Sequence, residues 1–350
     1  MYLDFHKINK MVNDKVHGVG NSSFTKRMSF SVIYISSCFS PCQLYYAALN
    51  NFGFVMVYKT PQSREAGDNN DHKPLFTLKI SEKPAFSITT IENCLVLAGY
   101  DQLKFFSWDD LKIGKLSCLW AEKECTKYSK AKYISKVTHN NGVLYCGDSN
   151  GQVTSFDIET GQKIFDFVGH VNYIHDLSTF DNGFVSVSED GCMKIWDVRG
   201  GNMTSEVQPH LKHDLSRPKL GKFLKCVTSD AKGDWIVCGG GPKLTMYSRN
   251  NLELYTPLEN ENNQFVANLV DIFNEEIVAA GNESCLRRWH MNGKSKTNVV
   301  CEINSAGIFS IASTVSATGK KGLPVIVCGS DQRIPVFLNF GYQATSLKSI

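Results

Sequence analysis

The sequence predicts an all-β protein, a propeller of seven blades, because one pattern recurs seven times along its 350 residues. Each copy is an apolar strand, a small residue, a polar turn and a second strand that ends on an aromatic residue. The copies span 45–58, 95–106, 144–156, 184–196, 236–247, 277–289 and 325–337. They end on Tyr58, Phe106, Phe156, Trp196, Tyr247, Trp289 and Phe337. The average step of about 46 residues is typical of four-stranded blades.

The first blade should begin within the most apolar run of the chain, 30–49. Serines, a proline and a glutamine interrupt this run, so it predicts two strands and not a membrane-spanning helix. The opening residues, MYLDFHKINK, lack the apolar core of a secretory signal. At the far end, GYQATSL (341–347) either forms the outer strand of the last blade or leaves that place to an N-terminal strand. The sequence leaves both arrangements open.

The stretch IVCGGGPKLTMYS (236–248) places three glycines between two strands. A phosphate-binding loop would need backbone N–H groups in front of a helix N-terminus. Here Pro242 removes one N–H group, and the residues after Lys243 continue as a strand without a helix cap. The stretch therefore predicts a tight turn between two strands.

The fourth copy carries a complete WD-repeat signature, with GH at 169–170, S at 186, DG at 190–191 and WD at 196–197. These residue types predict a buried relay of hydrogen bonds among His170, Ser186, Asp190 and Trp196, in which each polar group satisfies another. A Ser–His–Asp trio is also the composition of a catalytic triad, but its place inside a repeat favours the structural role. The other copies retain little more than the packing aromatic.

Composition describes an ordinary globular protein, with 42% hydrophobic residues, 20% charged residues and a net charge of +3. This balance lacks the strong basicity of a dedicated nucleic-acid-binding protein. Seven repeats close into one ring, so we expect a single propeller domain at 28–350. The extension at 1–27 is either a short helix with a linker or a disordered leader.

The twelve cysteines are spread through the strands and form no CxxC pair. Cys146, Cys238 and Cys328 occupy the same position of three blades, just before a glycine, where each should pack as a small apolar side chain. We therefore expect no zinc site, no other cofactor and a reducing compartment.

Two segments are longer than the blades require. At 107–133, between the second and third blades, lysines at 123, 127, 130 and 132 are partly offset by glutamates, and we expect a solvated loop. At 208–225, between the fourth and fifth blades, His210, His213 and Asp214 lack a helix that would set a metal-binding spacing, so we expect no metal there.

The 208–225 segment is the candidate partner-binding surface. Arginine beside apolar side chains is the composition of interface anchors, and long loops on a rigid scaffold tend to carry binding residues. The candidates are Leu211, Leu215, Arg217, Lys219 and Lys222. The alternative is a solvated loop whose leucines cover the blade edge.

Several stretches resemble the THO complex subunit 6 family, in matching order from about residue 29 to the C-terminus. They are GHVNYIHDL (169–177), EDGCMKIWDVR (189–199), HDLSRP (213–218), DWIVCGGGPKLTMY (234–247) and VFLNFGYQATSL (336–347). The WD-repeat pattern requires neither SRP nor CGGGP, so these two are the more specific. Residues 1–27 and the second-blade insertion do not match well.

This resemblance implies a non-catalytic scaffold subunit of the THO part of the transcription–export assembly, which couples messenger-RNA transcription and processing to nuclear export. It implies a nuclear protein in a hetero-oligomer with other THO subunits, in which any RNA contact is made through the complex, and no membrane association.

A second interpretation starts from Trp196-Asp197-Val198-Arg199, which fits a short WDxR pattern. The pattern resembles substrate receptors of cullin-four ubiquitin ligases, in which Arg199 would help to dock an adaptor. Propellers carry many functions, so only the binding site can decide between the two.

Overall fold

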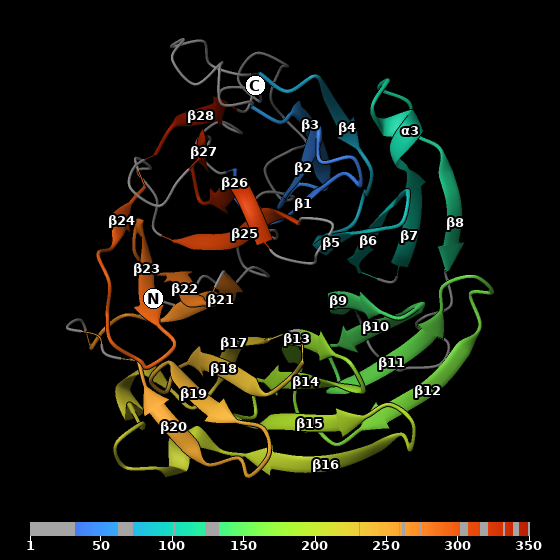
Figure 1. Ribbon diagram of the computed structural model, residues 1–350. Coiled ribbons are helices and arrows are strands. Elements are labelled where there is room, and N and C mark those ends of the chain that lie inside the picture. The colour runs from blue at the N-terminus through green and yellow to red at the C-terminus, as the bar shows by residue number, and fades with distance from the viewer. Residues whose placement is uncertain are drawn as a thin grey trace, which may run out of the picture.

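The computed structural model describes residues 32–61, 73–100, 102–122, 133–230, 232–258, 260, 263–273, 275–301, 307–315, 321–331, 333–338 and 343–348. The chain forms seven antiparallel sheets of four strands, arranged as blades around a central axis (Figure 1). The predicted seven-bladed propeller is therefore confirmed. The predicted boundary between an extension at 1–27 and the propeller lies outside the described residues.

Four consecutive strands make each blade, from the innermost to the outermost. Blades 1 to 3 are β1 (Tyr34–Phe39), β2 (Tyr45–Asn50), β3 (Phe54–Lys59), β4 (Phe76–Lys79); β5 (Ala85–Ile91), β6 (Cys94–Gly99), β7 (Gln102–Ser107), β8 (Cys118–Glu122); β9 (Ile134–Asn140), β10 (Val143–Asp148), β11 (Gln152–Asp157), β12 (Lys163–Val168). Blades 4 and 5 are β13 (Ile174–Phe180), β14 (Gly183–Ser188), β15 (Met193–Asp197), β16 (Asn202–Val207); β17 (Leu224–Ser229), β18 (Trp235–Gly240), β19 (Thr245–Ser248), β20 (Leu254–Pro257). Blades 6 and 7 are β21 (Ala267–Phe273), β22 (Glu276–Gly281), β23 (Cys285–His290), β24 (Val299–Val300); β25 (Ile308–Val315), β26 (Lys321–Gly329), β27 (Arg333–Phe337), β28 (Thr345–Lys348).

The recurrent aromatic lies in the third strand of every blade and is buried in all seven. It stands opposite an apolar residue of the second strand, as Phe184 stands opposite Trp196 and Ile277 opposite Trp289. Such cross-strand pairs stabilise a sheet because the two side chains pack on the same face. The aromatic residue therefore recurs in the sequence because the same packing contact recurs in every blade.

The apolar core is divided among seven clusters, one between each pair of neighbouring blades. Between blades 4 and 5, for example, Val185 and Val187 pack with Leu224 and Tyr247. Each blade contacts only its two neighbours, as in other repeat architectures. The blades therefore hold a rigid frame around the axis.

Each innermost strand carries a β-bulge near its start, where one residue is passed over in the pairing. The seven bulged residues are Ile35, Phe86, Ser135, His175, Lys225, Asn268 and Phe309. All seven line a central channel of about 2020 Å³. These bulges could not be predicted from the residue pattern, and they place polar, charged and apolar side chains together in the channel lining.

Ring closure, which the sequence left open, is settled at the C-terminus. β28 pairs with β27 and completes the last blade with its own fourth strand. β25 and β1 lie side by side (Figure 1), and the Ser37 and Ser310 hydroxyl oxygens are 2.7 Å apart. One apolar cluster joins Tyr34 and Tyr46 to Ile326 and Ile334. Side-chain packing and hydrogen bonds, without an exchanged strand, thus close the ring.

The second-blade insertion was predicted as a solvated loop, and for its described part that prediction is wrong. The helix α3 (Trp108–Leu111) and the outer strand β8 lie within it. Trp108 is buried and its indole N–H donates to the Thr90 hydroxyl, 3.2 Å away. An apolar anchor of this kind fixes the start of the insertion on the blade. The insertion's lysines at 123–132 lie outside the described residues.

None of the eleven cysteines that the structure describes forms a disulfide. Cys146, Cys238 and Cys328 are buried in β10, β18 and β26. Burial raises the pKa of the Cys238 thiol, and that of Cys328, to about 12. In the described ranges, no helix has the length and apolar character needed to cross a membrane.

Candidate functional site

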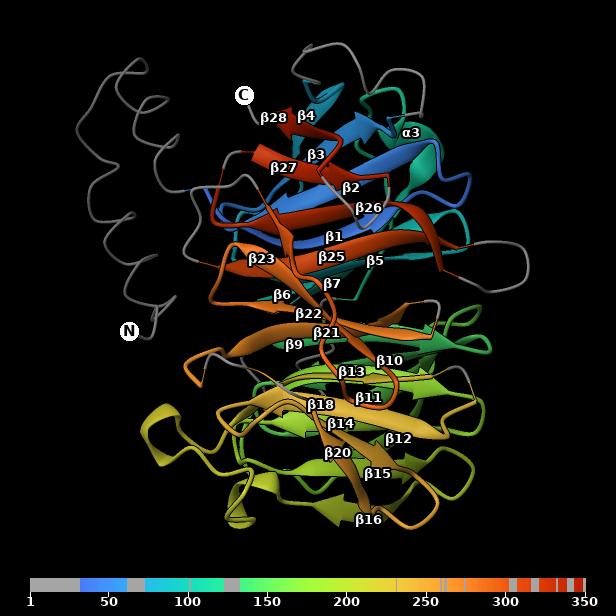
Figure 2. The same cartoon turned by 60° about the vertical axis from the view of Figure 1, so that its left-hand side comes forward.

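The segment between blades 4 and 5 follows a defined path across the end of the propeller. It contains two short 3-10 turns, η2 (Pro209–Leu211) and η3 (Pro218–Leu220), each begun by a proline. Proline suits a first helical position because its missing N–H group needs no partner there. In Figure 2 this yellow segment projects from the blades at the lower left. It is an ordered surface element.

Arg217 fixes this segment to the turn that follows β18. Its Nε–H donates to the Gly241 carbonyl oxygen at 2.8 Å, and its Nη2 group donates to Gly240 at 2.8 Å and Pro242 at 2.9 Å. Its Nη1 group donates to the carbonyl oxygens of Asn263 at 3.0 Å and Phe265 at 2.7 Å. All five donors of the guanidinium are therefore used within the chain.

The surroundings of Arg217 explain why an arginine is needed. Its acceptors are backbone carbonyls, which satisfy the N–H groups without neutralising the charge. Burial lowers the pKa of Arg217, since desolvation disfavours the charged form. A lysine ammonium has three donors and no planar fork, so it could not make the same set of bonds.

The glycine run at 239–241 is explained by the close approach of the same segment. A Cβ atom at Gly241 would lie 2.1 Å from the Gly221 carbonyl oxygen, and one at Gly240 would lie 2.4 Å from that of Phe223. The Gly241 N–H donates to the Phe223 carbonyl oxygen at 2.8 Å. The predicted turn between two strands is present, and it is also a docking surface for the 216–223 chain.

Two of the predicted partner-binding residues require correction. Leu215 is completely buried, and its carbonyl oxygen accepts the Lys243 N–H at 3.0 Å. Arg217 donates its N–H groups to backbone carbonyl oxygens of the same chain. Sequence alone could not show this, because the acceptors come from positions up to 48 residues away. Both residues hold the segment on the ring through contacts within the chain.

The remaining candidates are exposed. Leu211 is 71% exposed on η2, and Lys219 and Lys222 are exposed on and just after η3. Lys219 also lies at the central channel. Arg199, in the turn between β15 and β16, has a 75% exposed side chain that pairs with Asp197 at 3.3 Å. The exposed candidates thus occupy two places on the surface.

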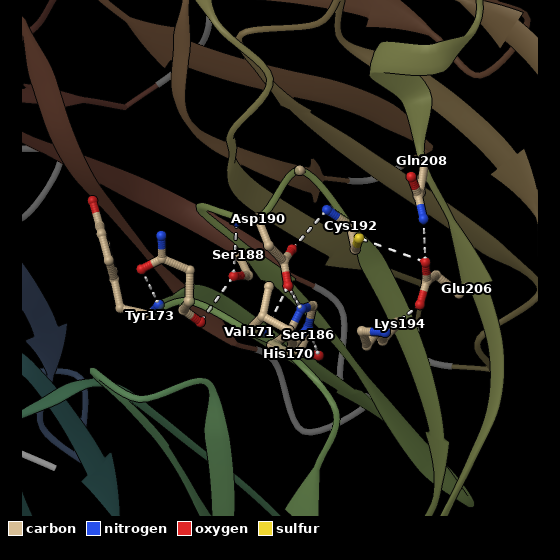
Figure 3. A network of polar contacts seen from close by, with 12 residues as sticks. His170, Val171, Tyr173, Ser186, Ser188, Asp190, Cys192, Lys194, Glu206 and Gln208 are labelled. Carbon is tan, nitrogen blue, oxygen red and sulfur yellow. Dashed lines mark hydrogen bonds and ion pairs between the residues drawn. The ribbon is translucent and has the colours of Figure 1, made fainter.

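The fourth blade contains a continuous chain of buried hydrogen bonds, and Figure 3 shows its part around His170, Ser186 and Asp190. The His170 Nδ1 atom is 2.9 Å from Asp190 Oδ2, and its Nε2 atom is 2.8 Å from the Ser186 hydroxyl. The Trp196 indole N–H donates to the same hydroxyl at 2.8 Å. With a neutral imidazole, Nδ1–H donates to the carboxylate and Nε2 accepts from Ser186, so every group is satisfied.

Asp190 also accepts the backbone N–H groups of Val171 at 3.1 Å and Cys192 at 2.9 Å. Burial alone would raise the pKa of Asp190, but the hydrogen bonds from His170 and from the two backbone N–H groups lower it well below its usual range. The carboxylate is therefore the ionised end of the relay. It joins the start of the blade to its second turn.

The same trio has the composition of a catalytic triad but not its accessibility. Ser186 is fully buried, and the side chains of His170 and Asp190 are 0% and 4% exposed. The Ser186 oxygen already accepts the Trp196 N–H. A nucleophile must reach its substrate, so this arrangement serves packing.

The histidines of the 208–225 segment point to different places. His210 Nδ1 lies 3.2 Å from the Gly191 carbonyl oxygen, while His213 and Asp214 are fully exposed and 3.4 Å apart. Among the residues that the structure describes, no three His, Cys, Asp or Glu side chains are grouped closely enough to hold a metal ion.

No family model matches the chain. The chain is similar to THO complex subunit 6 of Homo sapiens, with 27% identity over 320 residues that cover 89% of this chain and 91% of the human protein. It is similar to the THO complex subunit 6 homolog of Danio rerio, with 28% identity over 325 residues that cover 89% of this chain and 96% of that protein.

Among solved structures, the WD40 β-propeller domain of Doa1 has a similar fold. Its TM-score is 0.64, and the match covers 87% of this chain and 92% of that one. The sequences are only 12% identical, so this likeness concerns the fold alone.

Proposed function

We propose that this chain, which is similar to THO complex subunit 6 along nearly nine-tenths of its length, is the corresponding subunit of a THO complex. It acts there as a scaffold that binds other THO subunits within a hetero-oligomer. Its place of action is the nucleus, in messenger-RNA processing and export. Any contact with RNA is made through the assembled complex.

The observation that carries this proposal is the coverage of the similarity. The match extends over 89% of this chain and over 91% and 96% of the human and zebrafish proteins, so it is not confined to one repeated blade. Shared repeat chemistry alone would not require the carbonyl-bound Arg217 or the crowded Gly241. These two residues belong to the SRP and CGGGP stretches, which lie outside the repeat pattern.

A scaffold role agrees with the form of the molecule. Seven apolar interfaces make a rigid ring, and the exposed residues of the 208–225 segment stand on it in a fixed position. Binding residues on a rigid element lose little conformational entropy when a partner is bound. The buried Ser186, His170 and Asp190 support a role without catalysis.

Affinity purification of the tagged full-length chain from nuclear extract tests the proposal. We expect the other THO subunits in comparable amounts, retained at moderate salt. The matched control is an unrelated WD-repeat propeller with the same tag, expressed to the same level. Recovery of no THO subunit would contradict the proposal, and recovery of a cullin-four adaptor lost on Arg199→Ala would favour the ligase interpretation.

A further inference from the structure

One mouth of the central channel carries an unusual group of side chains. The seven innermost strands run the same way along the channel, so the residues at their starts meet at one end (Figure 1). Tyr133, Tyr173 and Phe223 come directly before β9, β13 and β17 and line the channel. Lys219 of η3 reaches the same lining. We call this end the aromatic mouth.

Lys225 is the central residue of the aromatic mouth. It is the bulged residue of β17, and its Nζ atom lies 6.0 Å from the centre of the Phe309 ring. Among the described residues, no carboxylate lies within ion-pair distance of this ammonium group. Burial lowers the pKa of Lys225, although Cys226 and Glu189 act in the opposite direction. An ammonium group held away from water gains strongly from an anion placed beside it.

The carboxylates near this position already have other partners. Glu189 lies 2.8 Å from His175 Nε2. Deeper in the channel, Asp176 forms a 2.9 Å ion pair with Lys136. At the opposite end the lining includes Asp230 and Glu275. The channel is therefore polarised, with the available positive charge of Lys219 and Lys225 at the aromatic mouth.

Aromatic rings line the same mouth. The Tyr133 ring lies 4.8 Å from that of Phe86 and is stacked with Tyr100 at 6.4 Å. The Tyr173 ring meets His175 edge-on at 4.3 Å. Such rings supply apolar contact area with little loss of side-chain entropy. The chemistry of the mouth thus combines cations with apolar surface.

We propose that the aromatic mouth binds an extended acidic segment of a partner protein, with one carboxylate paired to Lys225 and neighbouring apolar side chains packed on the rings. The channel exceeds the roughly 300–1,000 Å³ of small-molecule sites, which favours a polypeptide ligand. This inference goes beyond membership of a THO complex, because it names the chemistry of a ligand and holds for any partner that carries it.

Single-stranded nucleic acid is the other class of ligand that lysines and aromatic rings can bind. Base stacking needs open ring faces and a positive groove along the backbone. Here the Tyr133 ring packs against Phe86 and Tyr100, and the Lys225 ammonium lies over the Phe309 ring. These features favour the peptide.

The test uses the purified full-length chain and a fluorescein-labelled short peptide of alternating glutamate and valine, followed by fluorescence anisotropy at low salt. The comparison peptide carries glutamine in place of every glutamate. We expect the glutamate peptide to bind at least about tenfold more tightly. Lys225→Met, which retains most of the stem, should reduce this preference to within about twofold. Lys219→Ala, at an exposed position, should reduce it about threefold.

Lys294→Glu is the matched control, because Lys294 is exposed and lies outside the channel lining. It should leave the preference unchanged, and thermal melting should show that all variants are folded. Equal binding of the two peptides, or an unchanged preference in both Lys225→Met and Lys219→Ala, would overturn the proposal. So would tighter binding of a labelled oligouridylate that Lys225→Met abolishes, since the mouth would then be a nucleic-acid site.

Discussion

The Nε–H of Arg217 donates a 2.8 Å hydrogen bond to the carbonyl oxygen of Gly241, across 24 positions of the chain. The bond joins the segment between blades 4 and 5 to the turn within blade 5. Two further bonds reach Gly240 and Pro242 at the same turn, and two more extend the joint to the loop before blade 6. Two short sequence stretches that look unrelated are thus halves of one contact.

Replacing Arg217 should therefore destabilise the fold. We expect Arg217→Ala to lower the free energy of unfolding by at least about 2 kcal/mol, because bonds to a charged donor are lost and partly buried carbonyls are left without partners. Lys219→Ala, two residues away and exposed, should cost within about 0.5 kcal/mol. Denaturation monitored by tryptophan fluorescence measures both. Equal stability of the two variants would contradict the assigned role.

Gly241→Ala should be destabilising for a different reason. Its Cβ atom would lie 2.1 Å from the backbone oxygen of Gly221, so the segment must move away. Overpacking of this kind costs about 1–3 kcal/mol. Gly200→Ala is the control, because its Cβ atom would meet only the amide end of the Asn202 side chain at 3.0 Å. A melting temperature of Gly241→Ala equal to that of Gly200→Ala would refute the close approach.

Asp190→Ala should break the relay of the fourth blade. It leaves His170 and the Val171 and Cys192 N–H groups without their acceptor, at about 1–3 kcal/mol for each group that stays unsatisfied. Asp181→Ala, at an exposed turn of the same blade, should be nearly neutral. Thermal melting at neutral pH compares them, and an unchanged melting temperature for Asp190→Ala is the contrary result.

The stabilisation by Asp190 should also depend on pH. Its pKa is lower in the folded protein than in the unfolded chain, so the stabilisation is complete above the unfolded value and decreases as the pH falls toward the folded one. The stability difference between the parent and Asp190→Asn should thus be constant from about pH 7 to 5 and shrink below about pH 4. Parallel melts across that range measure it. A difference that stays constant down to about pH 3 would argue against a lowered pKa.

The exposed part of the 208–225 segment should contribute to partner binding. We expect Leu211→Ser combined with Lys222→Glu to lower the recovery of THO subunits at least about threefold, because an apolar contact and a charge are removed together. The melting temperature should stay near that of the parent. Val300→Ser is the control, since Val300 is 70% exposed on blade 6. Full recovery by a folded double variant would place the interface elsewhere on the ring.

The fold could be predicted from the sequence because its basic contact is local and repeated. Phe184 and Trp196 are close in the chain and meet in one hairpin, and the same arrangement occurs seven times. For the candidate site, the sequence predicted where the segment lies but not which of its side chains are buried. The segment at 208–225 stands out by its length, but the burial of Leu215 and the acceptors of Arg217 depend on loops brought together by the ring.

Two further features, the outer strand of blade 2 and the bulged residues around the channel, could not be predicted from the sequence. β8 is separated from β7 by α3, so the spacing that marks other outer strands is lost in blade 2. Backbone pairing places Lys225 and the other bulged residues at the channel. Such bulges do not require a particular residue type, so the sequence does not reveal them. Local residue patterns predict the strands, whereas the contacts between side chains of different blades depend on how the ring is assembled.

Because every blade is built from four consecutive strands, synthesis on the ribosome completes the blades one at a time. Only the packing of β1 against β25 must wait, and the contact of Ser37 with Ser310 spans 273 positions. At about 5–20 residues per second, this interval lasts about 14–55 s. During that time the outward face of blade 1, with Tyr34 and Tyr46, has no neighbouring blade in the nascent chain. This apolar face is buried only once blade 7 has been made, so the last blade to be synthesised also protects the first.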